Sequence, residues 1–205
     1  ASVIWTDEAN FCRNGQVNLH NAHYWSDSNP HWVKRTRHQY QWSFNVWCGI
    51  YDGGIIGPIF FDQTLTGQRY VDEILEGTVD GFCSEVPLSC LPLLWYQQDG
   101  APAHSSSRAR NWLNATFHTQ WIGRHGPVHW PARSPDLSPL DFFLWGYVKD
   151  RVYVTETKTS DELKARITDV CSRIPPSVIK KATEDVIKRA QYCVAAEGDL
   201  FEHVL

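Results

Sequence analysis

The chain has 205 residues, a formal net charge of −4, ten tryptophans and no methionine. Its length suffices for one compact core, and 42% hydrophobic with 20% charged residues excludes a disordered tail or a collagen-like fibre. No run of 18 apolar residues predicts a membrane span, and the first residues do not resemble a signal peptide. The mildly acidic charge argues against a stand-alone nucleic-acid binder. The start on Ala1 favours a piece of a longer protein.

The first part of the chain predicts three strands. Residues 3–7 predict a short buried strand, and alternating apolar residues over 41–51 predict a second one. Asp52-Gly53-Gly54 predicts a hairpin turn into a third strand over 55–61. The connection over 8–39 is long enough to be either functional or disordered, and its tryptophans argue against disorder.

The second part predicts helices and further strands. In chain order these are a helix over 71–82, a strand over 93–98, a helix that Ser105 can cap, strands over 119–122 and 128–130, and helices beginning near 138, 160 and 177. Apolar stripes place most tryptophans in the core. This order predicts an α/β fold in which helices flank a mixed sheet.

The cysteines and paired histidines give no strong metal motif. Six cysteines occur without a Cys-x-x-Cys pair, which favours reduced thiols inside the cell and argues against zinc. His20 and His23 have no third ligand nearby in the sequence, so a metal pair there is not favoured.

Three aspartates at element ends are the candidates for chemistry. Asp7 is expected at the end of the first strand, Asp99 at the end of the fourth, and Asp141 in the first turn of a helix. Carboxylates that converge from separate elements provide the oxygen ligands that Mg²⁺ prefers. Two such ions can serve an in-line displacement at phosphorus.

Each aspartate also has an ordinary structural explanation. Asp7 fits a strand-end aspartate that faces solvent, Asp99 before Gly100 fits a turn, and Asp141 three residues after Ser138 fits a helix cap. On spacing alone, Asp136 and Glu8 remain rival acids.

Several long motifs occur in order along the chain. They are Trp5-Thr6-Asp7-Glu8, Asn18-Leu19-His20-Asn21, Asn29-Pro30-His31, Gln97-Gln98-Asp99-Gly100-Ala101-Pro102-Ala103-His104, the run from Trp121 to Pro131, and Ser134-Pro135-Asp136-Leu137-Ser138-Pro139-Leu140-Asp141-Phe142-Phe143-Leu144-Trp145-Gly146. Together they resemble the catalytic domain of mariner-like DNA transposases over essentially the whole chain.

The resemblance implies a ribonuclease H-like fold, a mixed sheet flanked by helices with a long loop insertion after the first strand. It implies one catalytic domain over 1–205 with a clamp-like loop over 8–39. The implied metal triad is Asp7, Asp99 and Asp141, holding two Mg²⁺ or Mn²⁺ ions, with Asp136 as a loop acid. The stretch between Asp99 and Asp141 is longer than in the best-known mariner members.

The resemblance also implies cut-and-paste DNA transposition. The family cleaves phosphodiesters at transposon ends and joins the 3′-hydroxyl to target DNA at TA. The implied partner is double-stranded DNA, and the full-length protein is expected to be a homodimer. The implied location is the nucleus, with no membrane association. The helix-turn-helix half that reads transposon ends is expected to be missing here. The alternatives are an inactive or domesticated DNA- or protein-binding module, and a ribonuclease H-like nuclease.

Two stretches without acids, 28–51 and 100–135, supply candidates for DNA contact. Positive side chains neutralise phosphates and dominate affinity for nucleic acid. The candidates are Lys34, Arg35, Arg37, Arg108, Arg110, Arg124, Arg133 and His104. For each cation the alternative is a solvated surface, and for His104 it is a packed residue that completes a turn.

Overall fold

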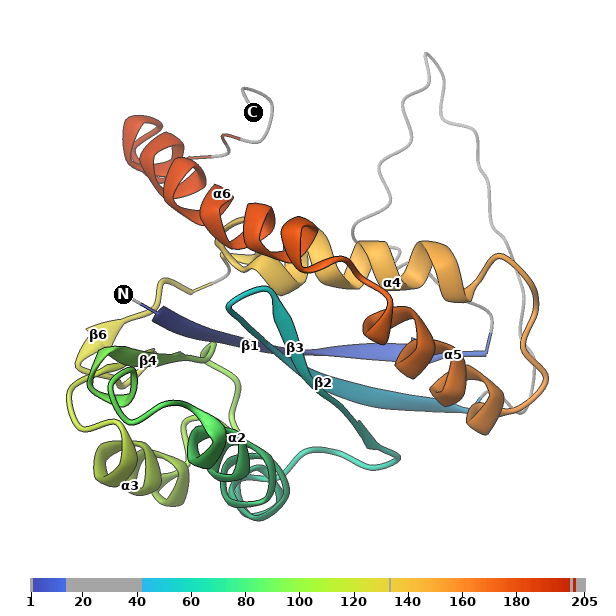
Figure 1. The fold of residues 1–205 in the computed structure, drawn as a ribbon, viewed down its shortest axis with the longest axis horizontal. Coiled ribbons are helices and arrows are strands. Elements are labelled where there is room, and N and C mark those ends of the chain that lie inside the picture. The colour runs from blue at the N-terminus through green and yellow to red at the C-terminus, as the bar shows by residue number, and fades with distance from the viewer. Residues whose placement is uncertain (1, 14–41, 133, 200, 202–205) are drawn as a thin grey trace.

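A computed structural model describes residues 2–13, 42–132, 134–199 and 201. Its strands form one mixed sheet in the order β3-β2-β1-β4-β5-β6 (Figure 1). The strands are β1 (Ser2–Cys12), β2 (Ser43–Tyr51), β3 (Gly54–Phe61), β4 (Leu94–Gln97), β5 (Trp121–Gly123) and β6 (Val128–His129). The first three strands are antiparallel, and β4, β5 and β6 run parallel to β1. The predicted mixed sheet is confirmed.

β1 is longer than the sequence analysis predicts. The expected strand over 3–7 is wrong at its end, because residues 8–12 continue to pair with β2, from Glu8 opposite Trp47 to Cys12 opposite Ser43. Asp7 therefore stands inside the strand. The connection expected from residue 8 begins after β1, and residues 14–41 lie outside the described residues.

The β2–β3 hairpin is confirmed at the expected turn. Asp52 and Gly53 both have positive φ, 43° and 81°, which a two-residue hairpin turn requires. β3 lies at the edge of the sheet, and the β2–β3 register shifts between Trp47 and Gly49. Pro58 in β3 thus occurs where an edge strand and an irregular ladder tolerate it.

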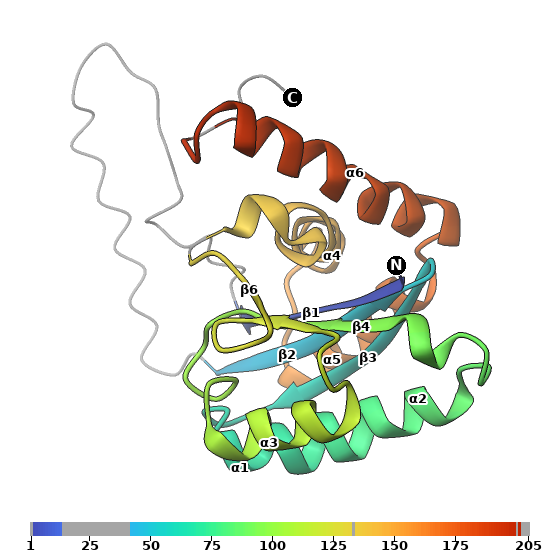
Figure 2. The same cartoon turned by 90° about the vertical axis from the view of Figure 1, so that its left-hand side faces the viewer.

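Helices cover both faces of the sheet (Figure 2). One face carries α1 (Gly67–Arg69), η2 (Tyr70–Val79), α2 (Asp80–Glu85) and α3 (Ser107–Thr116), and the other carries η5 (Leu140–Leu144), α4 (Trp145–Val152), α5 (Ser160–Ser172) and α6 (Pro176–Ala195). Two short helices, η3 (Leu91–Leu93) and η4 (Pro135–Leu137), lie in connections. Ser106, not Ser105, caps α3, because its hydroxyl accepts a hydrogen bond from Ala109 N at 3.2 Å.

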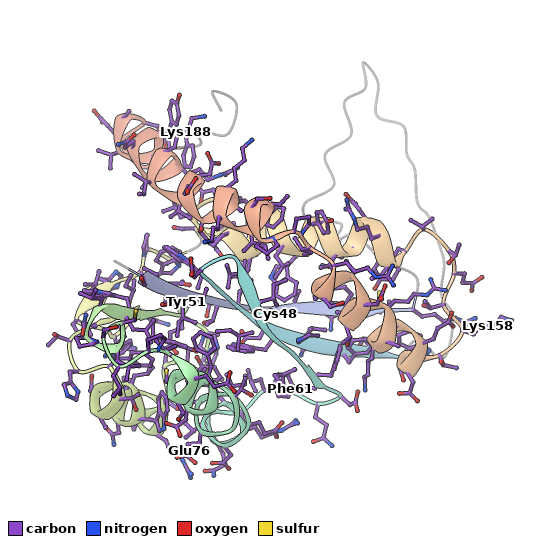
Figure 3. All side chains as sticks on the ribbon, viewed as in Figure 1. Cys48, Tyr51, Phe61, Glu76, Lys158 and Lys188 are labelled. Atoms are coloured by element: carbon purple, nitrogen blue, oxygen red, sulfur yellow. The ribbon has the colours of Figure 1, made fainter. Side chains whose placement is uncertain are left out.

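Two hydrophobic cores result, one on each face, and Figure 3 shows the side chains that fill them. Phe44, Val46, Cys48 and Ile50 face the α4 and α5 side, as their alternation predicts. Trp47 points to the opposite face and is fully buried under η2. All six cysteines are free thiols. No described helix is long and apolar enough to cross a membrane.

Candidate active site

Asp7 and Asp99 are brought together by the pairing of β1 with β4. These strands run parallel, and their last paired residues are Trp5 and Gln97. Each aspartate follows two residues later, and both line the same pocket. Ligand sites of α/β sheets occur at the carboxyl ends of parallel strands, where neighbouring strands diverge. This is such a place, since β1 continues with β2 while β4 ends.

Asp141 reaches the same place from the start of η5. Its backbone N–H donates to Ser138 Oγ at 3.4 Å, so the capping role considered for this segment is present. Asp141 nevertheless lines a pocket of about 590 Å³ together with Asp7 and Asp99. The other lining residues are Thr6, Glu8, Gln97, Gly100, Ala101, Arg124, His129, Trp130, Pro131, Ala132, Ser134, Pro135 and Ser138. The three aspartates therefore line one pocket, while their role as a metal-binding catalytic triad stays a prediction.

Of the rival acids, one is excluded from the pocket wall. Asp136 is absent from the pocket lining, and its carbonyl oxygen accepts a hydrogen bond from Arg189 at 3.0 Å. Glu8 does line the pocket, but it projects from the opposite face of β1 to Asp7 and is held by His104. Adjacent strand residues point to opposite faces of a sheet. Asp7 and Glu8 are adjacent in sequence but therefore point to opposite faces of β1.

The carboxyl groups of Asp7 and Asp141 crowd each other. Burial, the charge of Asp141 and the charge of Glu8 raise the pKa of Asp7 well above its usual range, against a hydrogen bond from Trp145. Burial and the charge of Asp99 also raise the pKa of Asp141, although Ser138 and Asp7 offer it hydrogen bonds. Like charges this close resist ionising together. A bound cation would relieve this repulsion.

Two residues of α4 interact with the acids of the pocket from outside its lining. Trp145 Nε1 donates a hydrogen bond of 2.7 Å to Asp7 Oδ2. Lys149 lies above the Phe11 ring at 5.4 Å, and burial lowers its pKa despite nearby Asp141 and Asp7. Sequence reasoning missed both. An apolar helical stripe identifies Trp145 as buried, but only the packing of α4 on β1 shows which polar atom it reaches.

Asp99 is held in a different way from the other two acids. Its Oδ1 accepts from Ala101 N at 2.9 Å and lies 2.6 Å from His104 Nδ1. Burial would raise the pKa of Asp99, but the hydrogen bond and charge of His104 and the Ala101 N–H lower it below its ordinary value. His104 is 1% exposed and both of its ring nitrogens face carboxylates. This burial does not fit the expected phosphate contact at His104.

The three other candidates for DNA contact that the structure describes have different surroundings. Arg124 lines the pocket, with its side chain against Gly100. Arg108 is bound to Asp72 at 2.8 Å and Gln68 at 2.6 Å, on the outer surface of α3 and η2. Arg110 donates to the neighbouring Ser107. Lys34, Arg35, Arg37 and Arg133 lie outside the described residues.

The donor set fits a hard divalent cation in chemistry and charge. Asp7, Asp99 and Asp141 offer carboxylate oxygens, the ligands that Mg²⁺ and Mn²⁺ prefer, and their mutual repulsion favours a cation between them. Over the described ranges, no three His, Cys, Asp or Glu side chains stand close enough together to hold an ion.

A second groove, of about 940 Å³, lies between α6 and the start of β1. It is larger, but Asp52 and Glu184 are its only acidic lining residues, it has no basic ones, and its other walls are largely apolar. Reactive groups are therefore concentrated in the smaller pocket.

The fold and pocket define an α/β domain of the ribonuclease H-like type with three aspartates in the lining of one pocket. In sequence the chain is similar to the Tc1 transposase of Caenorhabditis elegans, with 28% identity over 97% of this chain and 69% of that protein. It is also similar to the Tcb1 transposase of Caenorhabditis briggsae, with 26% identity over the same shares. No protein-family model matches the chain.

The solved structures that this fold resembles include several of Mos1 transposase. The Mos1 mariner catalytic domain has a TM-score of 0.72 at 16% identity and is matched over 98% of this chain and 84% of that one. The pre-cleavage Mos1 transpososome gives 0.77 at 16% identity. The chain spans about 57% of the protein in that complex. The resemblance to mariner-like transposases and the ribonuclease H-like fold are thus confirmed.

Proposed function

We propose that this chain is the catalytic domain of a Tc1/mariner-type DNA transposase. It would cleave phosphodiesters at transposon ends and join the 3′-hydroxyl to target DNA. The observation that carries the proposal is that Asp7, Asp99 and Asp141 line one pocket, although they come from a strand, the segment after a strand and a helix start. Similarity to Tc1 and Tcb1 over nearly the whole chain supports it.

The residues of the pocket suit chemistry on a phosphodiester. Asp7, Asp99 and Asp141 would hold two Mg²⁺ or Mn²⁺ ions, which supply positive charge for the attacking and leaving oxygens. Trp145 orients Asp7 by its hydrogen bond, and Arg124 places a positive charge on the wall where a DNA phosphate would lie. The proposed reaction needs no covalent nucleophile from the protein, because cleavage and joining are both displacements at phosphorus.

The neighbours in fold support the same partners. The Mos1 structures include a paired-end complex with the left transposon end and paired-end complexes with Mn and with Mg. We extend transposon-end DNA and a divalent metal to the present chain. A TA target, a homodimer of the full-length protein and action in the nucleus are proposed from the family resemblance alone.

A strand-transfer assay tests the proposal. The chain is mixed with a pre-cut transposon end that carries a free 3′-hydroxyl, a supercoiled TA-containing plasmid and Mn²⁺. Joined product is expected from the wild type, with loss of at least about 100-fold in Asp7→Asn and Asp99→Asn, since such substitutions remove metal ligands. Asp150→Asn, an exposed acid of α4 that lies outside the pocket lining, is the matched control.

The outcomes separate the candidate functions. Hydrolysis of the plasmid without joining would favour a ribonuclease H-like nuclease. Joining that survives Asp7→Asn would contradict the proposed triad. A chain that binds DNA but neither cuts nor joins would favour the non-catalytic module.

A further inference from the structure

His104 joins two acids that come from different strands. Its Nδ1 lies 2.6 Å from Asp99 Oδ1, and its Nε2 lies 3.0 Å from Glu8 Oε1. Glu8 belongs to β1 and Asp99 follows β4, so the imidazole spans the divergence between these strands. Both ring nitrogens face carboxylate oxygens, which only accept hydrogen bonds. The form of histidine that satisfies both contacts is the protonated imidazolium, which donates from both nitrogens.

The imidazole is fixed by a buried polar network beneath the pocket. The Tyr70 ring packs on it with centroids 4.3 Å apart, and Tyr70 Oη donates to Gln98 Oε1 at 2.7 Å. Gln98 Nε2 in turn donates to the His104 carbonyl at 3.1 Å, and Tyr96 Oη lies 2.8 Å from Tyr70 Oη. The exposed fraction of each of these four residues is at most 2%. Such a satisfied network makes the ring position rigid.

The orientation of Asp99 follows from this support. Both hydrogen bonds that described residues make to its carboxylate go to Oδ1, from His104 and from Ala101 N. The side chain is still 47% exposed and lines the pocket. One oxygen is therefore fixed against the protein, which leaves Oδ2 for the pocket.

We propose that His104 is a positioning residue, which clamps Asp99 to Glu8 and so presents one oxygen of Asp99 to a divalent cation in the pocket. This rests on the proposed function, because it assumes that Asp99 holds metal there. Glu8 is the anchor of the clamp: it keeps the ring in place from the β1 side and does not itself compete with Asp7. The charge of Glu8 and the hydrogen bond of Asp99 overcome the effect of burial and raise the pKa of His104 to about 10, in agreement with two carboxylate partners.

The test measures Mn²⁺ binding directly, by calorimetry and by the electron paramagnetic resonance signal of free Mn²⁺, without DNA or turnover. The variants are His104→Ala, Glu8→Ala, their double, and Glu8→Gln, which keeps an oxygen that can accept from His104 Nε2. His125→Ala is the matched control, because His125 is an exposed histidine outside the pocket lining. Thermal unfolding checks that each variant folds.

Residues that orient metal ligands typically change metal affinity 10- to 100-fold, so we expect His104→Ala and Glu8→Ala each to weaken Mn²⁺ binding by about 10-fold or more. The double variant should bind no more weakly than His104→Ala, since both act through one clamp, and Glu8→Gln should stay within about threefold of the wild type.

Mn²⁺ affinity within about twofold of the wild type in folded His104→Ala would overturn the clamp. Independent, additive losses in the double variant would do the same. If His104→Ala does not fold, the two Glu8 variants decide: equal weakening in both contradicts a clamp that depends on an oxygen acceptor. Failure of the wild type to bind Mn²⁺, or binding unaffected by Asp7→Asn, overturns the metal site itself and with it the proposed function. If the wild type binds Mn²⁺ through Asp7 but His104→Ala binds it equally well, only the clamp is overturned and the proposed function stands.

Discussion

Trp145 Nε1 donates a hydrogen bond of 2.7 Å to Asp7 Oδ2 and so joins the start of α4 to the middle of β1. Trp145 is 5% exposed and packs in the core between this helix and the sheet. One side chain thereby supports the hydrophobic core and orients a carboxylate of the pocket.

Replacing Trp145 by Phe should cost more stability than the loss of ring area alone. The buried Asp7 carboxyl would lose its indole donor, and an unpaired buried group of this kind costs about 1–3 kcal/mol. Chemical denaturation measures the free energy of unfolding, with Trp112→Phe as the control, because Trp112 is a half-buried ring packed on the other core. Equal losses in the two variants would contradict a specific bond to Asp7.

Replacing Asp141 by Asn should stabilise the metal-free domain. The raised pKa values of Asp7 and Asp141 mean that their ionised forms are disfavoured in the folded state at neutral pH. Removing one charge relieves the repulsion, and we expect Tm to rise by about 2 °C. Added Mn²⁺ should stabilise the wild type but not Asp141→Asn. Differential scanning calorimetry measures Tm with and without Mn²⁺. If Tm of the metal-free Asp141→Asn variant changes only as much as that of Asp150→Asn, repulsion between Asp7 and Asp141 is contradicted.

Replacing Arg189 by Lys should loosen the loop that carries Asp141. The Arg189 guanidinium lies 3.9 Å from the Phe142 ring centroid and donates to Asp136 O at 3.0 Å, which ties α6 to η4 and η5. A lysine cannot keep the planar stack and the directed bonds together. The expected loss is about 1–2 kcal/mol in the free energy of unfolding. Lys188→Ala, at the exposed neighbouring position, should change it by less than about 0.5 kcal/mol.

Replacing Arg124 by Gln should weaken DNA binding in a salt-dependent way. One lost phosphate contact lowers the slope of log K against log salt concentration by about 0.9. Arg108→Gln should change the slope less, because Asp72 and Gln68 already bind its guanidinium. Fluorescence anisotropy with a duplex at several salt concentrations measures both slopes. Equal slopes for Arg124→Gln and the wild type would remove Arg124 from the DNA path.

The sequence predicts the elements well where hydrophobic periodicity is local. Alternation over 41–51 and the Asp-Gly turn determine the β2–β3 hairpin, since a two-residue turn imposes its register. The end of β1 could not be predicted. The acids Asp7 and Glu8 resemble the end of a strand, and only pairing with β2 shows that the strand continues to Cys12.

The site divides in the same way. Asp7 and Asp99 each follow an apolar run, so a meeting at one sheet edge can be predicted, and motif resemblance adds Asp141. The partners of these acids could not be predicted. His104 is five residues from Asp99 in sequence, but its second carboxylate, Glu8, is 96 residues away. Trp145 and Lys149 carry helical spacing that indicates burial, while their polar partners depend on how α4 packs across β1.

The most direct test of the central claim is the position of bound metal. Crystals soaked in Mn²⁺ should show anomalous scattering peaks in the pocket, bridging the carboxylates of Asp7 and Asp99, with Asp141 within coordination distance. The same soak of Asp7→Asn should lose these peaks. Wild-type crystals in which Mn²⁺ binds elsewhere, or leaves the three aspartates without metal at concentrations that support strand transfer, would contradict the account.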